Sequence, residues 1–178
     1  MHEELIDVLT DAGEITGPPI TSREVHARGL KHRTAHLWIV NSKGEVLLQK
    51  RAPELRFYPN HWDASAAGHI SHGETSLNAI LREAKEELGI TLAPSDLKKI
   101  GEGSWYIKSE TESHIENEVM DIYISNKDLK ENDLVIQTSE VAQTQWLSKE
   151  QFSDWIEGRG EILVPHPEEH KLILENLP

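Results

Sequence analysis

Three glutamates in the middle of the chain have the residue type and spacing for divalent metal chemistry. Glu83, Glu86 and Glu87 are three and four residues apart, and at about 100° per residue a helix would gather them on one face. Like charges at these spacings repel one another within a helix, so the arrangement needs solvent screening or a compensating cation. Carboxylate oxygens suit Mg²⁺ or Mn²⁺. The alternative is an acidic face that water alone solvates.

The segment around these glutamates has clear helix boundaries. Thr75 or Ser76 can cap a helix that runs to Leu88 and ends at Gly89, because glycine tolerates the left-handed conformation. Apolar residues occupy the side opposite to the glutamates. They are Leu77, Ile80, Leu81, Ala84 and Leu88. We therefore expect a short helix that turns its apolar side to the core and its acidic side to solvent or metal.

A glycine precedes this helix, at the end of a short apolar run. Residues 63–67 are predicted to form a strand, and Gly68 after them would let backbone carbonyls approach a ligand closely. The strand, the glycine loop and the acidic helix together indicate a site for metal and phosphate. The expected metal ligands are the three glutamates and the carbonyl of Gly68, with Mg²⁺ or Mn²⁺ as the ion.

The same segment resembles the Nudix hydrolase signature, Gly-x5-Glu-x7-Arg-Glu-U-x-Glu-Glu-x-Gly-U, in which U is a bulky aliphatic residue. The matching fixed positions are Gly68, Glu74, Arg82, Glu83, Glu86, Glu87 and Gly89. Ala84 stands where the signature prefers a larger aliphatic, which affects packing more than chemistry. The resemblance implies metal-dependent hydrolysis of a diphosphate bond. It also implies a structural role for Glu74 and Arg82, which would hold the loop and the helix together.

A longer stretch, residues 24–90, resembles the isopentenyl-diphosphate isomerase branch of the superfamily. The resemblance lies in EVHARGLKHRTAHLWIV, LLQKRA, the turn YPNHW and the triplet AGH. In such isomerases three histidines and two glutamates hold a metal. The matching positions here are His26, His32, His69, Glu116 and Glu118. This set is a second expected metal site, and its nitrogen and oxygen ligands would suit Zn²⁺, Mn²⁺ or Mg²⁺.

One position separates this chain from the isomerases. Their catalytic cysteine falls at Ala67, and alanine can neither donate nor accept the proton that allylic isomerisation requires. The chain instead retains every acidic position of the hydrolase signature. It is therefore interpreted as an isomerase-like Nudix hydrolase. An isomerase and a non-catalytic ligand-binding module are the alternatives.

The implied reaction is attack of water on a phosphorus atom of a diphosphate, assisted by metal. Glu86 or Glu87 could orient the water. Glu118, which would come from a separate strand, is the expected general base, while Glu116 and Glu140 are competing choices. The substrate could be a prenyl diphosphate, a nucleoside diphosphate derivative, a dinucleotide or a thiamine-type diphosphate.

A phosphate group needs a cationic partner, and basic residues precede the turn at Trp62. Arg51 matches a position that contacts diphosphate in the isomerases, and arginine can form bidentate hydrogen bonds to phosphate. Arg56 and Trp62 are further candidates for substrate binding. Some tryptophans could stack on a base or a prenyl group, or could belong to the core. They are Trp38, Trp62 and Trp105.

Composition limits the other possibilities. The chain has 178 residues, 18 basic and 31 acidic side chains, and a formal charge of −13. An acidic chain without clustered Lys and Arg argues against nucleic acid and anionic membranes as partners and favours a small-molecule substrate, which the Nudix resemblance implies is a diphosphate. The sequence contains no cysteine and no apolar run of membrane-spanning length, so we expect a cytoplasmic protein. Nudix relatives are often dimers, which makes a homodimer a further expectation.

The remaining pattern predicts strands interleaved with helices. A small N-terminal hairpin (residues 5–9 and 14–16) and a helix (22–27) precede strands at 34–40, 45–49, 99–108, 118–125 and 142–147. Helices are predicted at 149–157 and 168–177. We expect one domain over 1–178, with an N-terminal part (1–30), a Nudix core (31–165) and a C-terminal helix (166–178). The implied fold class is α/β (α+β), a sandwich with a central mixed sheet between helical layers. The tail with His166 and His170 could cover the site or form a plain amphipathic helix.

Overall fold

A mixed sheet forms the centre of the molecule in the computed structural model, which describes residues 4–109 and 114–178. The first three residues of the predicted N-terminal part lie outside the described residues. Seven of the described strands make this sheet, in the order β5-β4-β3-β8-β7, with β6 paired to β3 and β9 paired to β4. Their bounds are β3 (His32–Val40), β4 (Val46–Arg51), β5 (Trp62–Asp63), β6 (Ala66–His69), β7 (Leu97–Lys108), β8 (Ile115–Asn126) and β9 (Val141–Leu147). The pair β3 and β8 is parallel, and the other pairs are antiparallel.

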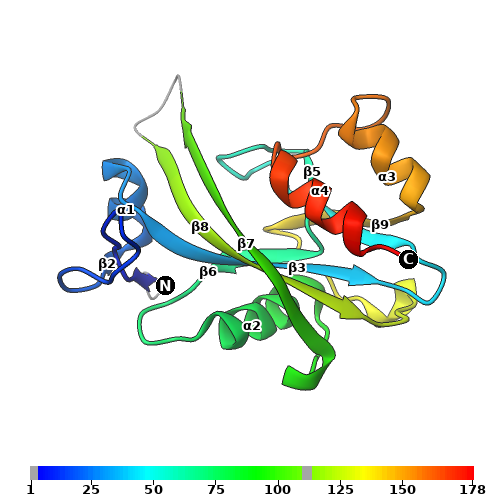
Figure 1. The fold of residues 1–178 in the computed structure, drawn as a ribbon, viewed down its shortest axis with the longest axis horizontal. Helices are drawn as coiled ribbons and strands as arrows, with labels where there is room; N and C mark the ends of the chain where they lie inside the picture. Colours follow the sequence, from blue (N-terminus) through cyan, green and yellow to red (C-terminus); the bar gives the residue numbers. More distant parts are fainter. Residues whose placement is uncertain (1–3, 110–113) are drawn as a thin grey trace.

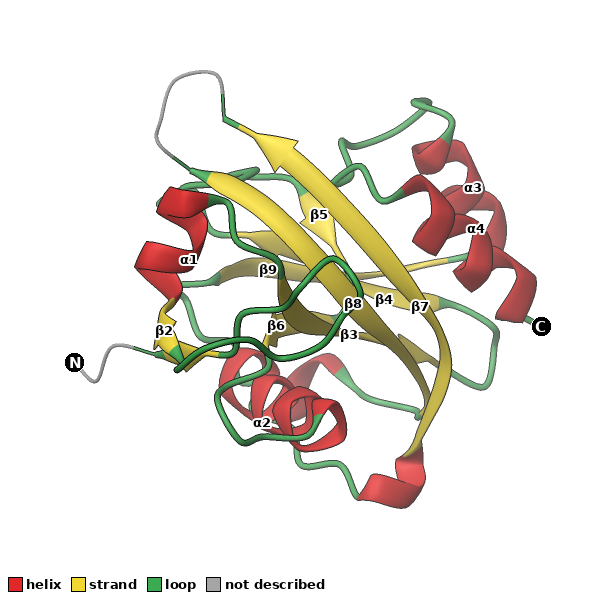
Figure 2. Cartoon of the chain, turned by 60° about the vertical axis from the view of Figure 1, so that its left-hand side comes forward, coloured by secondary structure: helices red, strands yellow, loops and turns green. Residues whose placement is uncertain are grey.

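Helices cover both sides of this sheet, as Figures 1 and 2 show. Helix α2 (Ser76–Leu88) lies on one side, while α3 (Lys149–Ile156) and α4 (Pro167–Asn176) lie together on the other. Helix α1 (Ser22–Arg28) stands at one end, next to a small sheet of β1 (Leu5–Ile6) and β2 (Ile20–Thr21). The predicted mixed sheet between helical layers is confirmed. No helix within the described residues is long and apolar enough to cross a membrane.

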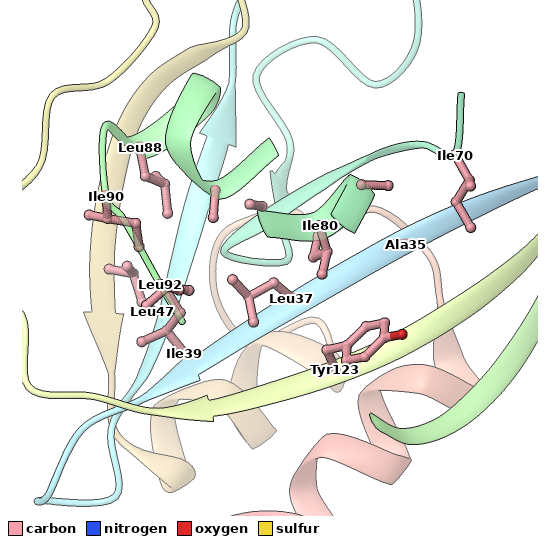
Figure 3. Packing of buried hydrophobic residues seen from close by; sticks show 13 residues of the cluster. Ala35, Leu37, Ile39, Leu47, Ile70, Ile80, Leu88, Ile90, Leu92 and Tyr123 are labelled. Carbon is pink, nitrogen blue, oxygen red and sulfur yellow. The ribbon is translucent and has the colours of Figure 1, made fainter. Parts of the chain in front are cut away.

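Strand β3 links the two layers because its side chains alternate between the faces of the sheet. Leu37 and Ile39 pack in the cluster that includes Ile80 of α2, and Figure 3 shows this contact layer. On the opposite face, the fully buried Trp38 packs against Phe152 of α3, with ring centroids 5.5 Å apart. The central part of this strand therefore packs against α2 on one face and the C-terminal helices on the other.

The predicted boundaries of the acidic helix are confirmed. The Thr75 side chain accepts a hydrogen bond from the Asn78 amide, and Gly89 closes the helix in the left-handed region with φ of 71°. A Cβ atom added at Gly89 would lie 2.7 Å from Cβ of Val135. Glycine is thus required at this end for both its conformation and its size.

The predicted strand at 63–67 was wrong, because the chain divides its hydrogen bonds there between two partner strands. Strand β5 pairs with β4, and β6 pairs with β3. Between them, the Ser65 hydroxyl donates to the Leu47 carbonyl at 2.6 Å and accepts from the Ile39 amide at 2.8 Å. Gly68 therefore lies inside strand β6 and not in a loop after a strand.

The N-terminal hairpin also differs from its prediction. Its turn forms, but residues 9 and 15 make only an isolated bridge. The extended pairing joins Ile6 to Ile20 and Leu5 to Thr21, because Gly17, with φ of 71°, and the two prolines after it redirect the chain beyond the predicted second strand.

We expect Gly89→Ala to destabilise the protein more than Gly158→Ala, measured by urea denaturation. Both glycines have left-handed backbones, with φ of 71° and 77°, but only Gly89 faces a neighbour within contact distance. The left-handed conformation alone costs about 1–2 kcal/mol, and the contact with Val135 should add roughly 1 kcal/mol or more. Equal losses of unfolding free energy would contradict the role of that contact.

Candidate active site and metal centres

A cleft of about 750 Å³ collects most of the residues that the sequence singled out. Within the register of β3 and β6, Thr34 lies opposite His69 and His36 lies opposite Ala67, so these four side chains share one face of the sheet. The sequence-predicted residues that line the cleft are His26, Arg51, Arg56, Gly68, His69, Arg82, Glu83, Glu86, Glu87, Glu116, Glu118 and Glu140. Its size is typical of a small-molecule site.

The acidic helix does not present its three glutamates to water as one solvated face. Glu83 and Glu87 are buried, at 7% and 5% exposure, whereas the Glu86 side chain is 52% exposed. Glu87 Oε2 accepts a hydrogen bond from the Ala67 amide at 3.0 Å and from Gln49 Nε2 at 3.2 Å. The expectation of a common face is confirmed, since all three glutamates line the cleft. The alternative of a face that water alone solvates is wrong, because Glu83 and Glu87 turn inward to the sheet.

Burial changes the protonation of these carboxylates. It raises the pKa of Glu83 to about 7, although Arg82 opposes the shift. Burial and the neighbouring charge of Glu83 raise the pKa of Glu87 well above its ordinary value. Two carboxylates that have lost hydration and repel one another favour a divalent cation between them. The donor set therefore fits Mg²⁺ or Mn²⁺.

Gly68 and Arg82 fix the acidic helix against β6 and against the loop between β6 and the helix. A Cβ atom at Gly68 would lie 2.1 Å from Glu83 Oε1, so the carboxylate occupies the space that any side chain would take. Arg82 contacts both oxygens of Glu74, at 3.3 and 3.1 Å, and donates to the His69 carbonyl at 3.1 Å. It also reaches Glu83 at 2.7 Å. These contacts join helix, loop and strand as the predicted structural role of Glu74 and Arg82 requires.

Three histidines converge at the C-terminal end of β6, where His26, His32, His69 and Glu118 offer ligand atoms within 4.8 Å of one another. Each ring has its Nδ1 atom near an oxygen that serves as acceptor. The Nδ1 partners are Ser22 O at 2.7 Å, Leu30 O at 3.0 Å and Glu4 Oε2 at 3.0 Å. Each Nδ1 therefore donates, and in the neutral ring Nε2 presents its lone pair to the cluster.

The inward nitrogens of this cluster are poorly satisfied without a cation. The Nε2 atoms of His26 and His69 lie 3.3 Å apart. The Nε2 atom of His32 is buried, and no hydrogen-bond partner for it is found in the part of the chain that the structure describes. It lies 3.6 Å from Glu118 Oε1. A proton on His26 Nε2 can be donated to Glu116, 3.1 Å away, but in the neutral rings the lone pairs of Nε2 face one another and repel. The donor set therefore fits a metal with nitrogen and oxygen ligands.

Glu116, the fifth residue of the expected set, is held by His26 of this cluster and by a fourth histidine, His114. Its carboxylate lies 3.1 Å from His26 Nε2 and 2.6 Å from His114 Nε2. Burial opposes ionisation, but these hydrogen bonds hold the pKa of Glu116 well below its usual range. His114 stacks on His26, with centroids 4.4 Å apart. The sequence reasoning missed His114, although its spacing of two residues from Glu116 and four from Glu118 was a signal.

The basic residues of the expected set lie at the rim of the cleft. Arg51 lines the cleft, donates to the Phe57 carbonyl at 3.1 Å and reaches Asp63 Oδ2 at 3.3 Å. Arg56 also lines it. Both positions suit contact with a phosphate of the substrate.

The tryptophans divide between core and cleft. Trp38 and Trp62 are 0% and 2% exposed and belong to the core on the side of α3 and α4. Trp62 does not line the cleft, so its burial gives no support to the expected role in substrate binding. Trp105 does line the cleft, next to Tyr58 at 5.6 Å and His166 at 4.3 Å between ring centroids.

The sequence reasoning also missed a buried ion pair beside the cleft. His36 Nδ1 lies 3.0 and 3.1 Å from the two oxygens of Glu169, and Trp38 Nε1 donates to Glu169 Oε1 at 2.8 Å. Helix α4 is thus not a plain amphipathic tail, because it buries Glu169 and His170, and His166 at its N-terminal cap lines the cleft. The signal that could have found His36 is the alternation of polar residues along β3.

Solved structures with the same fold are MutT and Nudix proteins. DR0079 from Deinococcus radiodurans superposes with a TM-score of 0.70 at 20% identity, covering 94% of this chain and 98% of that one. The MutT protein from Methanosarcina mazei Go1 gives a TM-score of 0.63 at 19% identity, covering 82% of this chain and 94% of that one. At these identities the likeness shows the fold alone. The fold is that of the MutT and Nudix proteins.

Sequence comparison agrees with this class, since the NUDIX domain family matches residues 30–165. Nudix hydrolase 3 of Arabidopsis thaliana is 34% identical over 169 residues, 93% of this chain, although the chain spans only 22% of that longer protein. An uncharacterized Nudix hydrolase of Listeria innocua is 35% identical over 163 residues, covering 88% and 86% of the two chains. An isopentenyl-diphosphate Delta-isomerase of Escherichia coli is 30% identical over 146 residues, covering 82% and 78%.

The chain therefore belongs to the Nudix family, and it is an enzyme of the Nudix hydrolase type. Family members of this type act on small-molecule diphosphates and generally need divalent metal ions. Both predicted resemblances, to Nudix hydrolases and more weakly to the isomerase branch, are confirmed.

We expect Gly68→Ala to weaken Mn²⁺ binding at the acidic helix by about tenfold or more, because the new methyl group must displace the Glu83 carboxylate. Titration of Mn²⁺ followed by electron paramagnetic resonance measures this affinity. Gly103→Ala is the matched control, since its added Cβ meets only side-chain atoms of Met120 and Ile122, the nearest at 2.9 Å. Unchanged Mn²⁺ affinity in folded Gly68→Ala would contradict the account of this contact.

We expect His32→Gln to lose one bound transition metal ion per chain. The wild-type protein and the variants would be loaded with Mn²⁺ or Zn²⁺ and dialysed, and their metal content would be measured by elemental mass spectrometry. His72→Gln is the control, because His72 is an exposed histidine paired with Asp7 at 2.7 Å and lies outside the cluster. Equal metal content in all three proteins would contradict a metal site at the histidine cluster.

Proposed function

We propose that this enzyme hydrolyses the diphosphate bond of a small molecule by attack of water on phosphorus. Glu83, Glu86, Glu87 and the Gly68 carbonyl would hold Mg²⁺ or Mn²⁺, which when bound neutralises phosphate charge and acidifies water. The observation that supports this most is the pair of buried carboxylates with raised pKa values at the wall of the cleft.

The contacts of the acidic helix assign a task to each residue. The Ala67 amide and Gln49 both donate to Glu87 Oε2. This leaves Oε1 of Glu87 for a ligand in the cleft. Glu86 is the more solvated member of the set and can exchange protons with water. These two glutamates would bind and orient the attacking water.

The choice of general base depends on the histidine cluster. Glu118 lies inside that cluster, and a carboxylate that ligates a cation there cannot also accept a proton at the acidic helix. Glu116 is already held by His26 and His114. Glu140 lines the cleft, and its charge acts on Glu87. We therefore assign Glu118 to the second metal site and Glu140 to proton acceptance.

The same cleft suggests how a substrate would lie. Arg51 and Arg56 would contact phosphate oxygens. Trp105 and Tyr58 offer aromatic surface to the organic group, which suits a nucleoside, a prenyl chain or a thiamine-type ring. A cytoplasmic location and a homodimer stay predictions.

An isomerase reaction is the second candidate, because the histidine cluster and the Escherichia coli relative both favour it. Ala67 weighs against it. The alanine lines the cleft at the position of the isomerase cysteine, and a methyl group cannot transfer a proton.

The test is release of phosphate or pyrophosphate with Mg²⁺ or Mn²⁺ from a panel of prenyl, nucleoside, dinucleotide and thiamine diphosphates. We expect turnover of one class, with Glu87→Gln at least about 100-fold slower because it loses a ligand charge. Glu175→Gln, at an exposed helical glutamate, is the control. Exchange of allylic protons without phosphate release would favour the isomerase. Ligand binding without turnover would favour a non-catalytic module.

A further inference from the structure

Strand β3 presents a row of polar side chains to the cleft side of the sheet. His32, Thr34, His36 and Trp38 are every second residue, with Arg33, Ala35 and Leu37 between them, and a strand places them on one face. His32 belongs to the histidine cluster and Trp38 to the core. Thr34 and His36 lie between them and line the cleft. The Thr34 hydroxyl is buried, and none of the described residues pairs with it.

The contact of His36 with Glu169 buries a full ion pair. The two residues are 4% and 2% exposed. Burial alone would lower the pKa of His36, but the charge and hydrogen bond of Glu169 raise it to about 9. Burial opposes ionisation of Glu169 as well, yet His36 lowers its pKa to about 2. Apolar residues could anchor α4 without the desolvation that a buried ion pair requires, so the pair indicates a use for the imidazolium.

The geometry leaves one nitrogen of that imidazolium for a ligand. Its Nδ1 donates to Glu169, and its ring lines the cleft. Among residues 4–109 and 114–178, the hydrogen bonds found for this ring are those of Nδ1 to Glu169, and none is found for Nε2. His36 lies directly across from Ala67, whose amide holds Glu87. The imidazolium therefore stands one strand away from the acidic helix.

We propose that His36 binds a phosphate oxygen of the substrate through Nε2, as a phosphate subsite on the cleft floor that Glu169 keeps charged. This assignment rests on the proposed diphosphate hydrolysis. The imidazolium would supply a charge-assisted hydrogen bond to the substrate in addition to the contacts of the metal ligands. The charged groups that act on His36 are Glu169 from α4, Asp63 from β5 and Glu118 from β8. The ring of His166 also faces it and is uncharged.

An anion suits this place better than a metal ion, although His36, His166 and Glu169 have ligand atoms within 4.8 Å. The carboxylate of Glu169 already accepts from His36 and from Trp38, and the protonated ring of His36 repels cations. Burial lowers the pKa of His166 and leaves that ring neutral. Its Nδ1 is buried and unpaired with respect to the described chain, so it can share a hydrogen bond with a phosphate.

The test measures binding of methylenediphosphonate, a diphosphate analogue that water cannot cleave, by calorimetry in Mg²⁺ near neutral pH. We expect His36→Gln to raise Kd about tenfold, because it removes a charged hydrogen bond. His170→Gln is the matched control. His170 is also a buried histidine, on α4, and its ring centroid lies 6.0 Å from that of Trp38, but it does not line the cleft. Its Kd should stay within about twofold of wild type, and thermal unfolding would show that both variants are folded.

Glu169→Gln separates charge from packing, because glutamine keeps the size of the side chain and one acceptor oxygen for His36 and Trp38. We expect it to weaken binding in the same direction, and the double variant to be no worse than His36→Gln alone. With a turned-over substrate, His36→Gln should raise KM more than it lowers kcat.

An unchanged Kd in folded His36→Gln, or the same loss in His170→Gln, would overturn the subsite and leave the pair as an anchor for α4. The failure of the proposed function has a different signature. Binding of the analogue that depends on His36, without hydrolysis of any compound, would keep the subsite and reject the hydrolase. Hydrolysis of a substrate, together with a Kd of the analogue that does not depend on His36, would keep the hydrolase and reject the subsite.

Discussion

The burial of two like charges one helical turn apart is the constraint on which the cleft depends. Glu83 and Glu87 are withdrawn from water against β6, and burial raises both of their pKa values. Arg82 offsets part of this cost but is shared among several carboxylates. A glycine at position 68 is required because the Glu83 carboxylate fills the adjacent space. The proposed metal site is the arrangement that relieves this repulsion.

Strand β3 carries most of the remaining functional side chains in one row. Its cleft-side residues run from His32 in the histidine cluster, past Thr34 and His36 on the cleft floor, to Trp38 beside Glu169. Its other face carries the apolar layer under α2. The strand therefore couples both proposed metal sites and the proposed phosphate subsite to one rigid element, which favours a fixed geometry of the functional side chains.

The sequence could predict those parts of the fold whose determining residues lie close together in the chain. Helix α2 was predictable because its cap at Thr75, its end at Gly89 and its periodicity lie within one segment. The strand at 63–67 was wrong because Ser65 divides it by contacts with residues far along the chain. The pair of His36 and Glu169 was missed because 133 positions separate its members. The histidine cluster was expected only through the family resemblance.

The most direct test of the account is a crystal structure with Mn²⁺ and methylenediphosphonate, with anomalous scattering used to locate the metal. The account predicts manganese beside the carboxylates of Glu83 and Glu87, a second anomalous peak at the Nε2 atoms of the histidine cluster, and a phosphonate oxygen within hydrogen-bond distance of His36 Nε2. Manganese absent from the acidic helix while the analogue occupies the cleft would contradict the claim that a cation relieves the buried carboxylates.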